Sequence, residues 1–316
     1  MTVLFASIDI GSHTARLLVA RSGEPFPSLN PVLRKRAYTR LAGDFIRSGR
    51  KVIPDTAVDR IAFVLEDFLA LAKIHRVGRI YAAATGVLRE AENRDHVLEA
   101  LNRLTGLEIR CLSGEEEALL SSLGVVHALG LGDPPYVVFD LGGGSTEIVV
   151  DSCGNRIVES LPLGASVLTS RFFASDPPAA GEIMELESEI QRVLKRAEIR
   201  IPGEKAANVI AGTGGTVTAL AAVLDDVGTD GIVPERINGL RVELQQVNEL
   251  IGSWQKLSIQ ERMRFSDLDE GRAEVILAGA MVVRAIMHYF GGGVTACMSD
   301  LLEGLIIESG GGYERK

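Results

Sequence analysis

Two glycine-rich turns contain the residue types that bind phosphate groups. The first runs from Asp9 to Ser12 and reads Asp-Ile-Gly-Ser, and the second runs from Asp140 to Ser145 and reads Asp-Leu-Gly-Gly-Gly-Ser. Glycine lets the backbone approach an oxyanion closely, and successive N–H groups in such turns form an anion-binding concavity. The adjacent aspartate cannot itself bind phosphate, but it can hold Mg²⁺, directly or through water. The two turns therefore predict a site for a phosphorylated ligand.

Each turn also has a purely structural interpretation, because Asp, Gly and Ser are the residues that tight hairpins use. One such turn alone would favour the hairpin. Here both turns follow an apolar strand and precede a returning strand, and Gly142, Gly143 and Gly144 are consecutive. Three glycines carry an entropic cost that a hairpin does not require. The pair of turns therefore favours anion binding.

A third glycine-rich segment runs from Gly212 to Thr216, between a predicted strand and a predicted helix. Its amides and the helix N-terminus could bind another anionic or nucleotide group, and a plain tight turn explains it almost as well. It lacks the lysine of a Walker A loop and does not read G-x-G-x-x-G.

Three consecutive glutamates, Glu115, Glu116 and Glu117, open a predicted helix. Ser113 and Glu116 have capping-box spacing, and acids are favoured in any first helical turn, so all three have a structural explanation. Clustered like charges would also raise one another's pKa, as a general base that deprotonates water requires. The residue types alone do not select which glutamate acts.

The composition excludes several classes of protein. With 316 residues, of which 46% are hydrophobic, the chain is expected to fold as two domains that need no disulfide bond or structural metal. Its three cysteines, Cys111, Cys153 and Cys297, lie far apart, which argues against disulfides and a zinc site. A net charge of −9 argues against a nucleic-acid-binding protein. The basic stretch from Arg34 to Lys51 is either a solvated face or a track for a polyanion.

No membrane segment or signal peptide is expected. The N-terminus has no Lys or Arg before its short apolar run, which soon reaches Asp9. The most apolar later stretch, 275–290, contains Arg284 and His288 and falls short of the roughly 20 residues that a membrane span needs. The sequence therefore predicts a soluble cytoplasmic protein.

The elements that position these residues follow from hydrophobic periodicity. In the first half we expect strands over 3–10, 15–20, 32–41, 79–84 and 107–112. We expect one helix that begins near residue 54, a second over 88–104 that ends before Gly106, and a third over 115–129. The second half predicts strands over 136–141, 146–151, 156–161, 208–211 and 294–297, and helices over 166–173, 182–196, 242–254, 273–290 and 301–308. Strands that alternate with helices imply mainly parallel sheets. The second half repeats the pattern of the first, which predicts a structural duplication.

Taken together, the motifs resemble those of the exopolyphosphatase/guanosine pentaphosphate phosphatase (Ppx/GppA) family, in its short two-domain form. The matching segments run in order over nearly the whole chain: Asp9 through Ser12, Ala84-Thr85 with Arg89-Glu90-Ala91, Ser113-Gly114 with Glu116-Glu117-Ala118, Asp140 through Glu147, Gly212 through Thr216 and Arg272 through Ala280.

The resemblance implies an α/β fold of the actin/Hsp70/sugar-kinase superfamily, with two ribonuclease-H-like domains, mixed sheets flanked by helices and an active site in the interdomain cleft. The domains are expected at 1–126 with 300–316, and at 127–299. The implied reaction is hydrolysis of the terminal phosphoanhydride bond of inorganic polyphosphate, guanosine pentaphosphate or both. Expected partners are these substrates, with no nucleic acid and no membrane, and a homodimer is left open.

The resemblance also implies roles for individual residues. Glu117 matches the catalytic base. Asp140 and Glu147 match metal-site carboxylates, for Mg²⁺ or alternatively Mn²⁺. Asp9 is a further expected metal ligand, because the aspartate beside a glycine turn can hold Mg²⁺. The residues expected to bind phosphate are Ser12, His13, Arg89, Gly142, Gly143, Gly144, Ser145, Thr146, Gly214 and Gly215.

The chain departs from the family pattern at two places. His13 stands where the family usually has Asn; a neutral imidazole can still donate a hydrogen bond to phosphate, although the ring could instead cap the turn. Leu302 stands where an Arg is common, so one positive contact is expected to be missing.

Two other functions are compatible with the sequence. A sugar or carboxylate kinase of the same superfamily would use a carboxylate to deprotonate an acceptor hydroxyl instead of water. A non-catalytic nucleotide or alarmone sensor would signal through closure of its two domains.

Overall fold

The computed structural model describes residues 3–23, 28–47, 51–152, 155–197, 199, 207–228 and 231–310. The chain divides into two compact units, residues 1–124 with 301–316 and residues 125–300. The domains assigned from the sequence differ from this division by one or two residues at each boundary, and that assignment stays a prediction. Cys153 and Arg50 lie outside the described residues.

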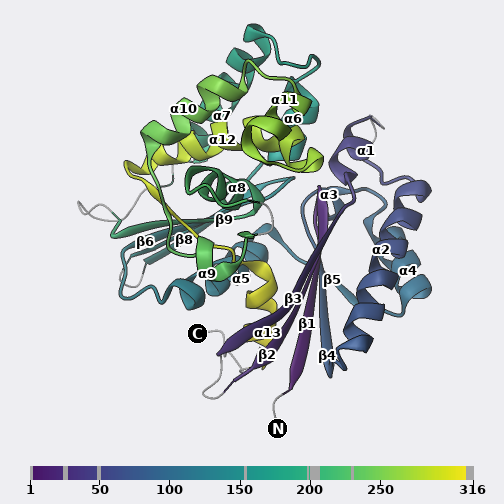
Figure 1. Cartoon of the computed structure of the whole chain (residues 1–316). Helices are drawn as coiled ribbons and strands as arrows, with labels where there is room; N and C mark the ends of the chain where they lie inside the picture. The colour runs from purple at the N-terminus through teal and green to yellow at the C-terminus, as the bar shows by residue number, and fades with distance from the viewer. Residues whose placement is uncertain are drawn as a thin grey trace. The chain divides into compact units, whose positions relative to one another are not determined.

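The first unit is built on a mixed five-stranded sheet in the order β3-β2-β1-β4-β5 (Figure 1). Strands β1, β2 and β3 form an antiparallel meander, whereas β4 and β5 continue from β1 in parallel. The strands are β1 (Leu4–Ile10), β2 (Thr14–Ser22), β3 (Leu29–Tyr38), β4 (Arg79–Ala84) and β5 (Ile109–Cys111). The helices are α1 (Leu41–Arg47), α2 (Asp55–Ile74), α3 (Val87–Glu90), α4 (Arg94–Thr105), α5 (Gly114–Leu129) and α13 (Leu301–Gly310).

Both faces of this first sheet are covered. Strand β1 is buried from Phe5 to Ile10, so residues on either face lie in apolar surroundings. Helix α13 contacts β1 and β2 through Leu302 and Ile306, and α2 packs against α4 and β2. Leu302 belongs to an apolar cluster with Phe5, which explains why an apolar residue occupies this position.

The second unit is built on a six-stranded sheet in the order β10-β11-β9-β6-β7-β8. The strands are β6 (Tyr136–Leu141), β7 (Thr146–Ser152), β8 (Asn155–Leu161), β9 (Val209–Thr213), β10 (Arg241–Val242) and β11 (Val294–Ala296). The helices are α6 (Ala165–Phe172), α7 (Ala180–Ala197), α8 (Gly215–Leu224), α9 (Pro234–Ile237), α10 (Leu244–Trp254), α11 (Ile259–Ser266) and α12 (Glu270–Phe290).

The second sheet repeats the first. Its strands β8-β7-β6-β9-β11 have the order and directions of β3-β2-β1-β4-β5, and β10 is an additional edge strand. Asp9 and Asp140 each occupy the second-last position of the equivalent central strands β1 and β6. The predicted duplication is therefore confirmed, and both glycine-rich turns follow the same strand of the repeat.

Some predicted elements were wrong. The helix expected over 88–104 is two helices, α3 and α4, because Ala91 adopts an extended conformation between them. The Asn93 side chain accepts a hydrogen bond from the backbone N–H of Ile53 and donates one to its carbonyl, which fixes this break. The mainly parallel sheets expected from the strand–helix alternation were wrong, whereas the mixed sheets that the resemblance implied are present. Strand β10 and the short helices α1, α9 and α11 were not predicted.

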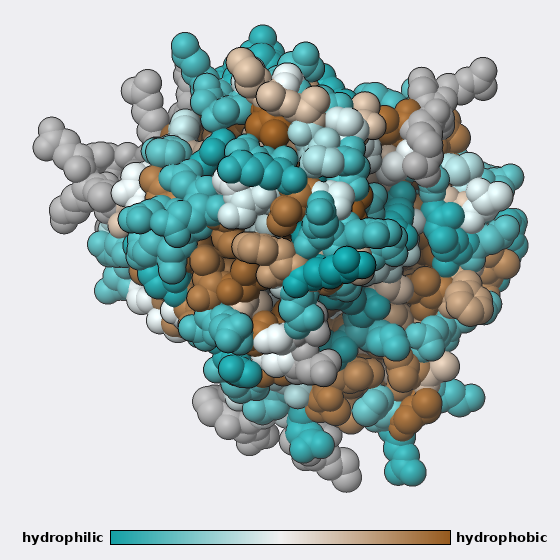
Figure 2. All heavy atoms as spheres, turned by 45° about the horizontal axis from the view of Figure 1, so that its top comes forward, coloured by the Kyte–Doolittle hydropathy of each residue, from teal (hydrophilic) through white to brown (hydrophobic). Residues whose placement is uncertain are grey.

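Helix α12 is the long apolar element of the second unit. It has 21 residues, more than the sequence pattern indicated, and its length and composition would suffice to cross a membrane. However, 67% of its most apolar window is buried inside the protein, as in a core helix. Arg284, one of its polar residues, forms an ion pair with Glu187 of α7. On the face shown in Figure 2, the surface is mostly hydrophilic, with hydrophobic residues in small patches.

Candidate functional site

The glycine loop after β6 is closed by a hydrogen bond from the Gly142 N–H to the Ser145 carbonyl at 3.0 Å. The Gly142 carbonyl accepts from the N–H of Ala165, and the Gly143 carbonyl accepts from the N–H groups of Ser166 and Val167, each at 3.0 Å. These donors belong to the first turn of α6, whose N–H groups have no partner within the helix. The N-terminus of α6 therefore binds the carbonyl side of the loop.

This arrangement decides which way the loop amides point. In a planar trans peptide the C=O and the following N–H point in opposite directions. Because the carbonyls of Gly142 and Gly143 face α6, the N–H groups of Gly143 and Gly144 face away from it. A Cβ at Gly164 would lie only 2.1 Å from the Gly144 carbonyl carbon, so the loop and the start of α6 are in direct backbone contact. The loop is thereby held with two amides presented for an anion.

Two carboxylates lie beside this loop. Asp140 and Glu147 are directly opposite each other in the antiparallel pair of β6 and β7, so their side chains are on the same face of the sheet. Both are buried. The Ser160 hydroxyl of β8, the cross-strand neighbour of Glu147, donates a hydrogen bond to the Glu147 Oε1 at 2.8 Å.

The third glycine segment lies next to the same strand end. Gly214 has φ +92°, and a Cβ there would lie 2.3 Å from the Leu141 carbonyl oxygen, so only glycine fits. Thr213 is the parallel neighbour of Asp140, and α8 begins immediately after Gly214. The Arg272 guanidinium lies so close to Gly215 that a Cβ would be 1.9 Å from its Nη2. Thus both glycine segments of the second unit meet at the end of β6.

Asp9, the equivalent aspartate of the first unit, has different surroundings. Its Oδ2 accepts hydrogen bonds from Arg16 Nη2 at 2.7 Å and Nε at 3.0 Å, and its Oδ1 accepts one from the Thr85 hydroxyl at 3.2 Å. The guanidinium already supplies the positive charge that a metal ion would bring. These contacts argue against the metal role predicted for Asp9.

Ser12 and His13 both have structural partners. The Ser12 hydroxyl accepts a hydrogen bond from the Val87 N–H at 2.9 Å, which ties the first turn to the start of α3 and leaves the hydroxyl hydrogen unused by that bond. The buried His13 ring packs edge-on against Tyr38, with ring centres 5.1 Å apart. Arg36 and Arg40 also lie over Tyr38, at 5.6 and 5.8 Å from the ring centre. The phosphate contact of His13 and its turn-capping alternative both stay predictions.

The structure brings Arg89 and Glu117 together. Arg89 Nη1 donates to Glu117 Oε2 at 2.5 Å, across 28 residues of sequence, and the same nitrogen lies 3.3 Å from the Leu112 carbonyl. Both side chains are largely buried, with 14% and 10% of their surfaces exposed. Arg89 comes from α3 and Glu117 from the first turn of α5, so the pair joins two of the family motifs.

The three glutamates of α5 have three different environments. Glu115 is exposed, Glu116 completes a capping box with Ser113, and Glu117 is buried against Arg89. The backbone hydrogen bond from Ser113, followed by the side-chain hydrogen bond from Arg110, lowers the pKa of Glu116. The raised pKa expected from clustered like charges is therefore wrong for Glu116. Burial selects Glu117 as the candidate base.

The donor set for a metal ion is small. Among the described residues, no group of three or more His, Cys, Asp or Glu side chains could hold a metal ion. The pair of Asp140 and Glu147 nevertheless fits Mg²⁺ or Mn²⁺, because such an ion is commonly held by one or two carboxylates together with waters and substrate phosphates. Their common face and the hydroxyl that orients Glu147 are the observations that support this fit.

Several residues around the site were not anticipated from the sequence. Gly164 and Ser160 were not singled out, although Gly164 stands between a strand and a helix, where close backbone contacts are common. Arg16 could have been found from the hairpin, because Asp9 and Arg16 are register partners in β1 and β2. The buried position of Glu117 had no sequence signal that separated it from Glu116.

The chain is similar to known phosphatases over nearly its whole length. The sequence model of the Ppx/GppA phosphatase family matches residues 18–310. The chain belongs to the Ppx/GppA phosphatase family. A relative in this family, Exopolyphosphatase 2 of Mycobacterium tuberculosis, is 32% identical over 322 residues, covering 97% of this chain and 98% of the relative. Exopolyphosphatase 1 of Mycobacterium leprae is 29% identical over 95% of this chain and 87% of its own length.

Solved Ppx/GppA structures have the same fold. The crystal structure of the Aquifex aeolicus family member has a TM-score of 0.80 and 28% identity, with 100% of both chains covered. An exopolyphosphatase from Cytophaga hutchinsonii has a TM-score of 0.85 over 97% of both chains, and at 21% identity it shows the fold alone. The predicted fold, two ribonuclease-H-like domains of the actin-like superfamily with mixed sheets flanked by helices, is confirmed.

Proposed function

We propose that this Ppx/GppA protein hydrolyses the terminal phosphoanhydride bond of inorganic polyphosphate, guanosine pentaphosphate or both. The observation that carries the proposal is the loop after β6, in which α6 binds the carbonyls so that the amides of Gly143 and Gly144 face outward. Such fixed donors stabilise charge that develops on a transferring phosphoryl group without reorganisation. The exopolyphosphatase names of the relatives support the same substrate class.

In the proposed mechanism, Glu117 is the general base. The ion pair with Arg89 holds the Glu117 carboxylate in place, and in this mechanism that carboxylate accepts a proton from the attacking water. The water oxygen forms a bond to the terminal phosphorus, the bridging P–O bond breaks, and orthophosphate leaves. The shortened chain or nucleotide keeps the bridging oxygen. Arg89 is also the predicted phosphate ligand, and a phosphate oxygen would compete with Glu117 for its donors.

We propose that Asp140 and Glu147 hold Mg²⁺ or Mn²⁺. When bound, such an ion neutralises negative charge on phosphate oxygens and polarises them. Burial of the two carboxylates and the hydrogen bond from Ser160 keep their oxygens oriented before an ion arrives. The phosphate-binding roles of Ser145, Thr146, Gly214 and Gly215 belong to the same proposal. The Thr146 hydroxyl donates to the Leu163 carbonyl at 2.7 Å, so it contributes by fixing the loop.

The test is release of orthophosphate by the purified protein from polyphosphate, guanosine pentaphosphate and ATP, each with and without Mg²⁺. The expected result is acceptor-independent release from at least one of the first two. Phosphate transfer that requires an added sugar or carboxylate would instead support a kinase. Tight binding of guanosine pentaphosphate with no turnover would support a sensor.

The wider setting is also proposed. We propose that the protein is cytoplasmic and that it binds its phosphate substrates but neither nucleic acid nor a membrane. A homodimer is a further assembly to test. The net charge of −9 and the burial of α12 inside the second unit support this proposal.

A further inference from the structure

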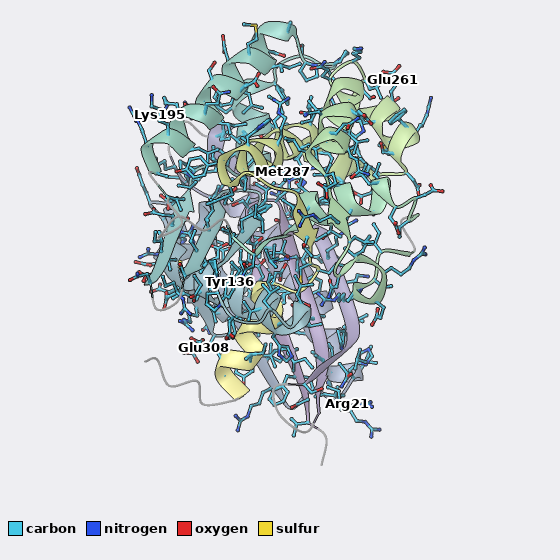
Figure 3. All side chains as sticks on the ribbon, turned by 90° about the vertical axis from the view of Figure 1, so that its left-hand side faces the viewer. Arg21, Tyr136, Lys195, Glu261, Met287 and Glu308 are labelled. Carbon is cyan, nitrogen blue, oxygen red and sulfur yellow. The ribbon has the colours of Figure 1, made fainter. Side chains whose placement is uncertain are left out.

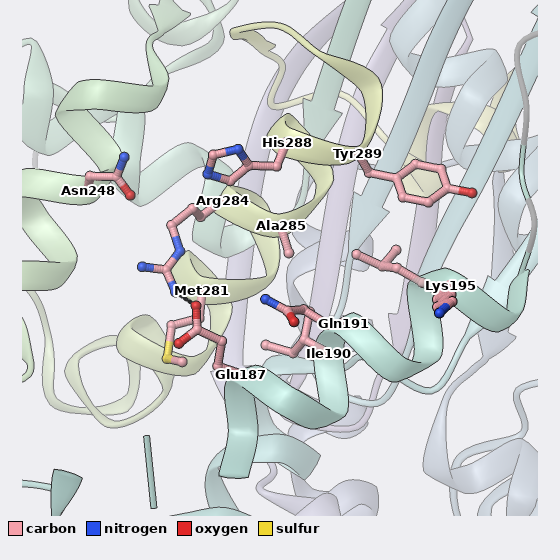
Figure 4. Close-up of a pocket in the computed structure, with 11 residues that line it drawn as sticks. Glu187, Ile190, Gln191, Lys195, Asn248, Met281, Arg284, Ala285, His288 and Tyr289 are labelled. Atoms are coloured by element: carbon pink, nitrogen blue, oxygen red, sulfur yellow. Dashed lines mark hydrogen bonds and ion pairs between the residues drawn. The ribbon is translucent and has the colours of Figure 1, made fainter. Parts of the chain in front are cut away.

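A cavity of about 650 Å³ opens on the second unit between helices α7 and α12, with Asn248 of α10 at its edge (Figure 4). None of its lining residues belongs to the glycine segments or to the pair of Asp140 and Glu147. The floor is apolar: Ile190, Leu194 and Met281 are at most 4% exposed, and Ala285 lies beside them. The size falls within the range of small-molecule sites, about 300–1,000 Å³.

The rim of this cavity is polar, and its two cationic side chains differ in whether an acidic partner lies beside them. Arg284 is compensated by Glu187, with Nη2 and Oε1 3.0 Å apart (Figure 4). Lys195 is exposed at the end of the cavity away from Arg284 (Figure 3 and Figure 4), and it has no ion-pair partner within the described part of the chain. The other polar lining groups are the amides of Gln191 and Asn248, the imidazole of His288 and the phenol of Tyr289. Among the described residues the rim thus keeps Lys195 without a carboxylate partner, on a chain whose net charge is −9.

We propose that this cavity, the α7/α12 groove, is a second ligand site that takes a small amphipathic anion. The apolar body of the ligand lies on Ile190, Leu194 and Met281, and its carboxylate or phosphate group pairs with Lys195. An apolar floor with a few polar groups that fix orientation is the usual construction of a small-molecule site. Charge complementarity between Lys195 and the ligand selects an anion over a neutral or cationic molecule of the same size.

Helix α12 connects this groove to the proposed catalytic loops. Its last turns supply Arg284, Ala285 and Tyr289 to the groove. Further toward its start, Gly279 lies against Thr216, where a Cβ would be 2.4 Å from the Thr216 Oγ1, and Arg272 lies against Gly215. Met287, labelled on α12 in Figure 3, is buried in the core of the second unit, so this helix is packed along its length. A ligand that repositions α12 therefore acts on the Gly212–Thr216 segment, and we infer that occupancy changes the KM for the phosphate substrate. This part rests on the proposed function.

The binding test uses anilinonaphthalene sulfonate as a fluorescent amphipathic anion and octanoate as its competitor. Octyltrimethylammonium has the same apolar chain with the opposite charge and is the control competitor. Octanoate is expected to displace the probe, and Lys195→Gln is expected to weaken its binding up to about fivefold, the range of an exposed ion pair. Lys73→Gln, on exposed α2 surface of the other unit, is the matched control and should leave binding unchanged.

A second variant fills the groove directly. Ala285→Phe places a ring on the apolar floor and is expected to abolish displaceable probe binding, with thermal unfolding as the check that the protein remains folded. Equal octanoate affinity in wild type and Lys195→Gln, or equal displacement by octyltrimethylammonium, would overturn the proposal. Conversion of the sample to a dimer that excludes the probe would assign the groove to a second copy of the chain instead.

The kinetic arm tests the coupling. Saturating octanoate is expected to change the KM for polyphosphate by about fivefold or more, the lower range of allosteric coupling. The change should disappear in Ala285→Phe. Probe binding with an unchanged KM would overturn the coupling through α12. If the protein released no orthophosphate at all, the proposed function would fail. The displacement of the probe by octanoate would still show whether the groove binds an amphipathic anion.

Discussion

At the scale of single residues, the structure separates side chains that look alike in sequence. The Glu116 carboxylate accepts hydrogen bonds from the Ser113 N–H of the α5 capping box and from Arg110, whereas Glu117 is buried against Arg89. A general base must lie within hydrogen-bond reach of the proton that it removes, so its side chain must be available, and Glu117 is the one buried glutamate of the three that is not part of the cap. The tertiary contact with Arg89 thus makes Glu117 the candidate base among the three.

The first prediction concerns this assignment. Glu117→Gln keeps the size and the hydrogen-bonding ability of the side chain but removes its basicity. It should lower kcat for orthophosphate release by about a hundredfold to ten-thousandfold, the usual contribution of general acid–base catalysis. Steady-state kinetics and thermal unfolding, measured on the same preparations, check it. The control Glu115→Gln should retain full activity, and near-normal kcat in folded Glu117→Gln protein would reject Glu117 as the base.

At the scale of elements, helix α6 holds the phosphate loop from behind. Its first amides bind the carbonyls of Gly142 and Gly143, and Gly164 allows the two backbones to touch. The loop amides can face an anion only while this contact persists. The chemistry of the loop therefore depends on a helix that was predicted from sequence without this role.

The second prediction follows from that contact. In Gly164→Ala the new Cβ would meet the Gly144 backbone at 2.1 Å, so the loop must shift. Activity should fall at least about tenfold, as when an oxyanion donor is displaced, with a stability loss of about 1–3 kcal/mol.

Gly181→Ala provides the control, since nothing lies within 4 Å of its Cβ position in α7. It should retain activity and should stabilise the protein by about 0.4–1 kcal/mol, because alanine reduces the entropy of the unfolded chain. Equal activity of the two variants would remove the loop contact from the mechanism.

The third prediction concerns the pH dependence of the α5 cap. Hydrogen bonds from Ser113 and Arg110 hold the pKa of Glu116 below its ordinary value of 4.5. A lowered pKa in the folded state stabilises the protein at pH values above 4.5, and this stabilisation is lost as the pH falls through the folded pKa.

Glu116→Ala should therefore be less stable than wild type by about 1 kcal/mol or less at neutral pH, the usual contribution of a cap. The two proteins should converge in acid. Urea unfolding at neutral pH and at a pH well below 4.5 checks both values. A difference that grows on acidification would contradict the assigned contacts.

At the scale of the whole molecule, one topology occurs twice and the two copies have diverged. Asp9 and Asp140 occupy equivalent positions, yet Asp9 is paired with Arg16, whereas Asp140 faces Glu147 across β6 and β7. The sequence suggested a metal role for both aspartates. Their partners favour the metal role that we propose for the second unit.

The fourth prediction compares these two aspartates. Chelation by EDTA should abolish orthophosphate release, and Mg²⁺ or Mn²⁺ should restore it. Asp140→Asn should raise the free Mg²⁺ concentration needed for half-maximal rate by about tenfold or more, as loss of metal-site interactions does. In Asp9→Asn that concentration should stay near the wild-type value, although stability falls because Arg16 loses its charged partner. Titration of the rate against free Mg²⁺ checks both, and a larger effect at Asp9 would reverse the assignment.

The sequence by itself determined the apolar strands, both glycine turns, the duplicated strand pattern and the family. These features are local, since a strand, a turn or a capping box such as that of Ser113 and Glu116 is specified by residues a few positions apart. The family followed because its motifs keep their order along the chain.

Only the tertiary structure decided which side chains meet. Arg89 and Glu117 are 28 residues apart, Thr85 and Asp9 are 76 apart, and Asn93 breaks a predicted helix by bonding to Ile53. Such partners depend on how strands pair and helices pack, which no local pattern encodes. The Arg89–Glu117 pair, the Asp9–Arg16 pair and the α7/α12 groove are therefore properties of the folded chain.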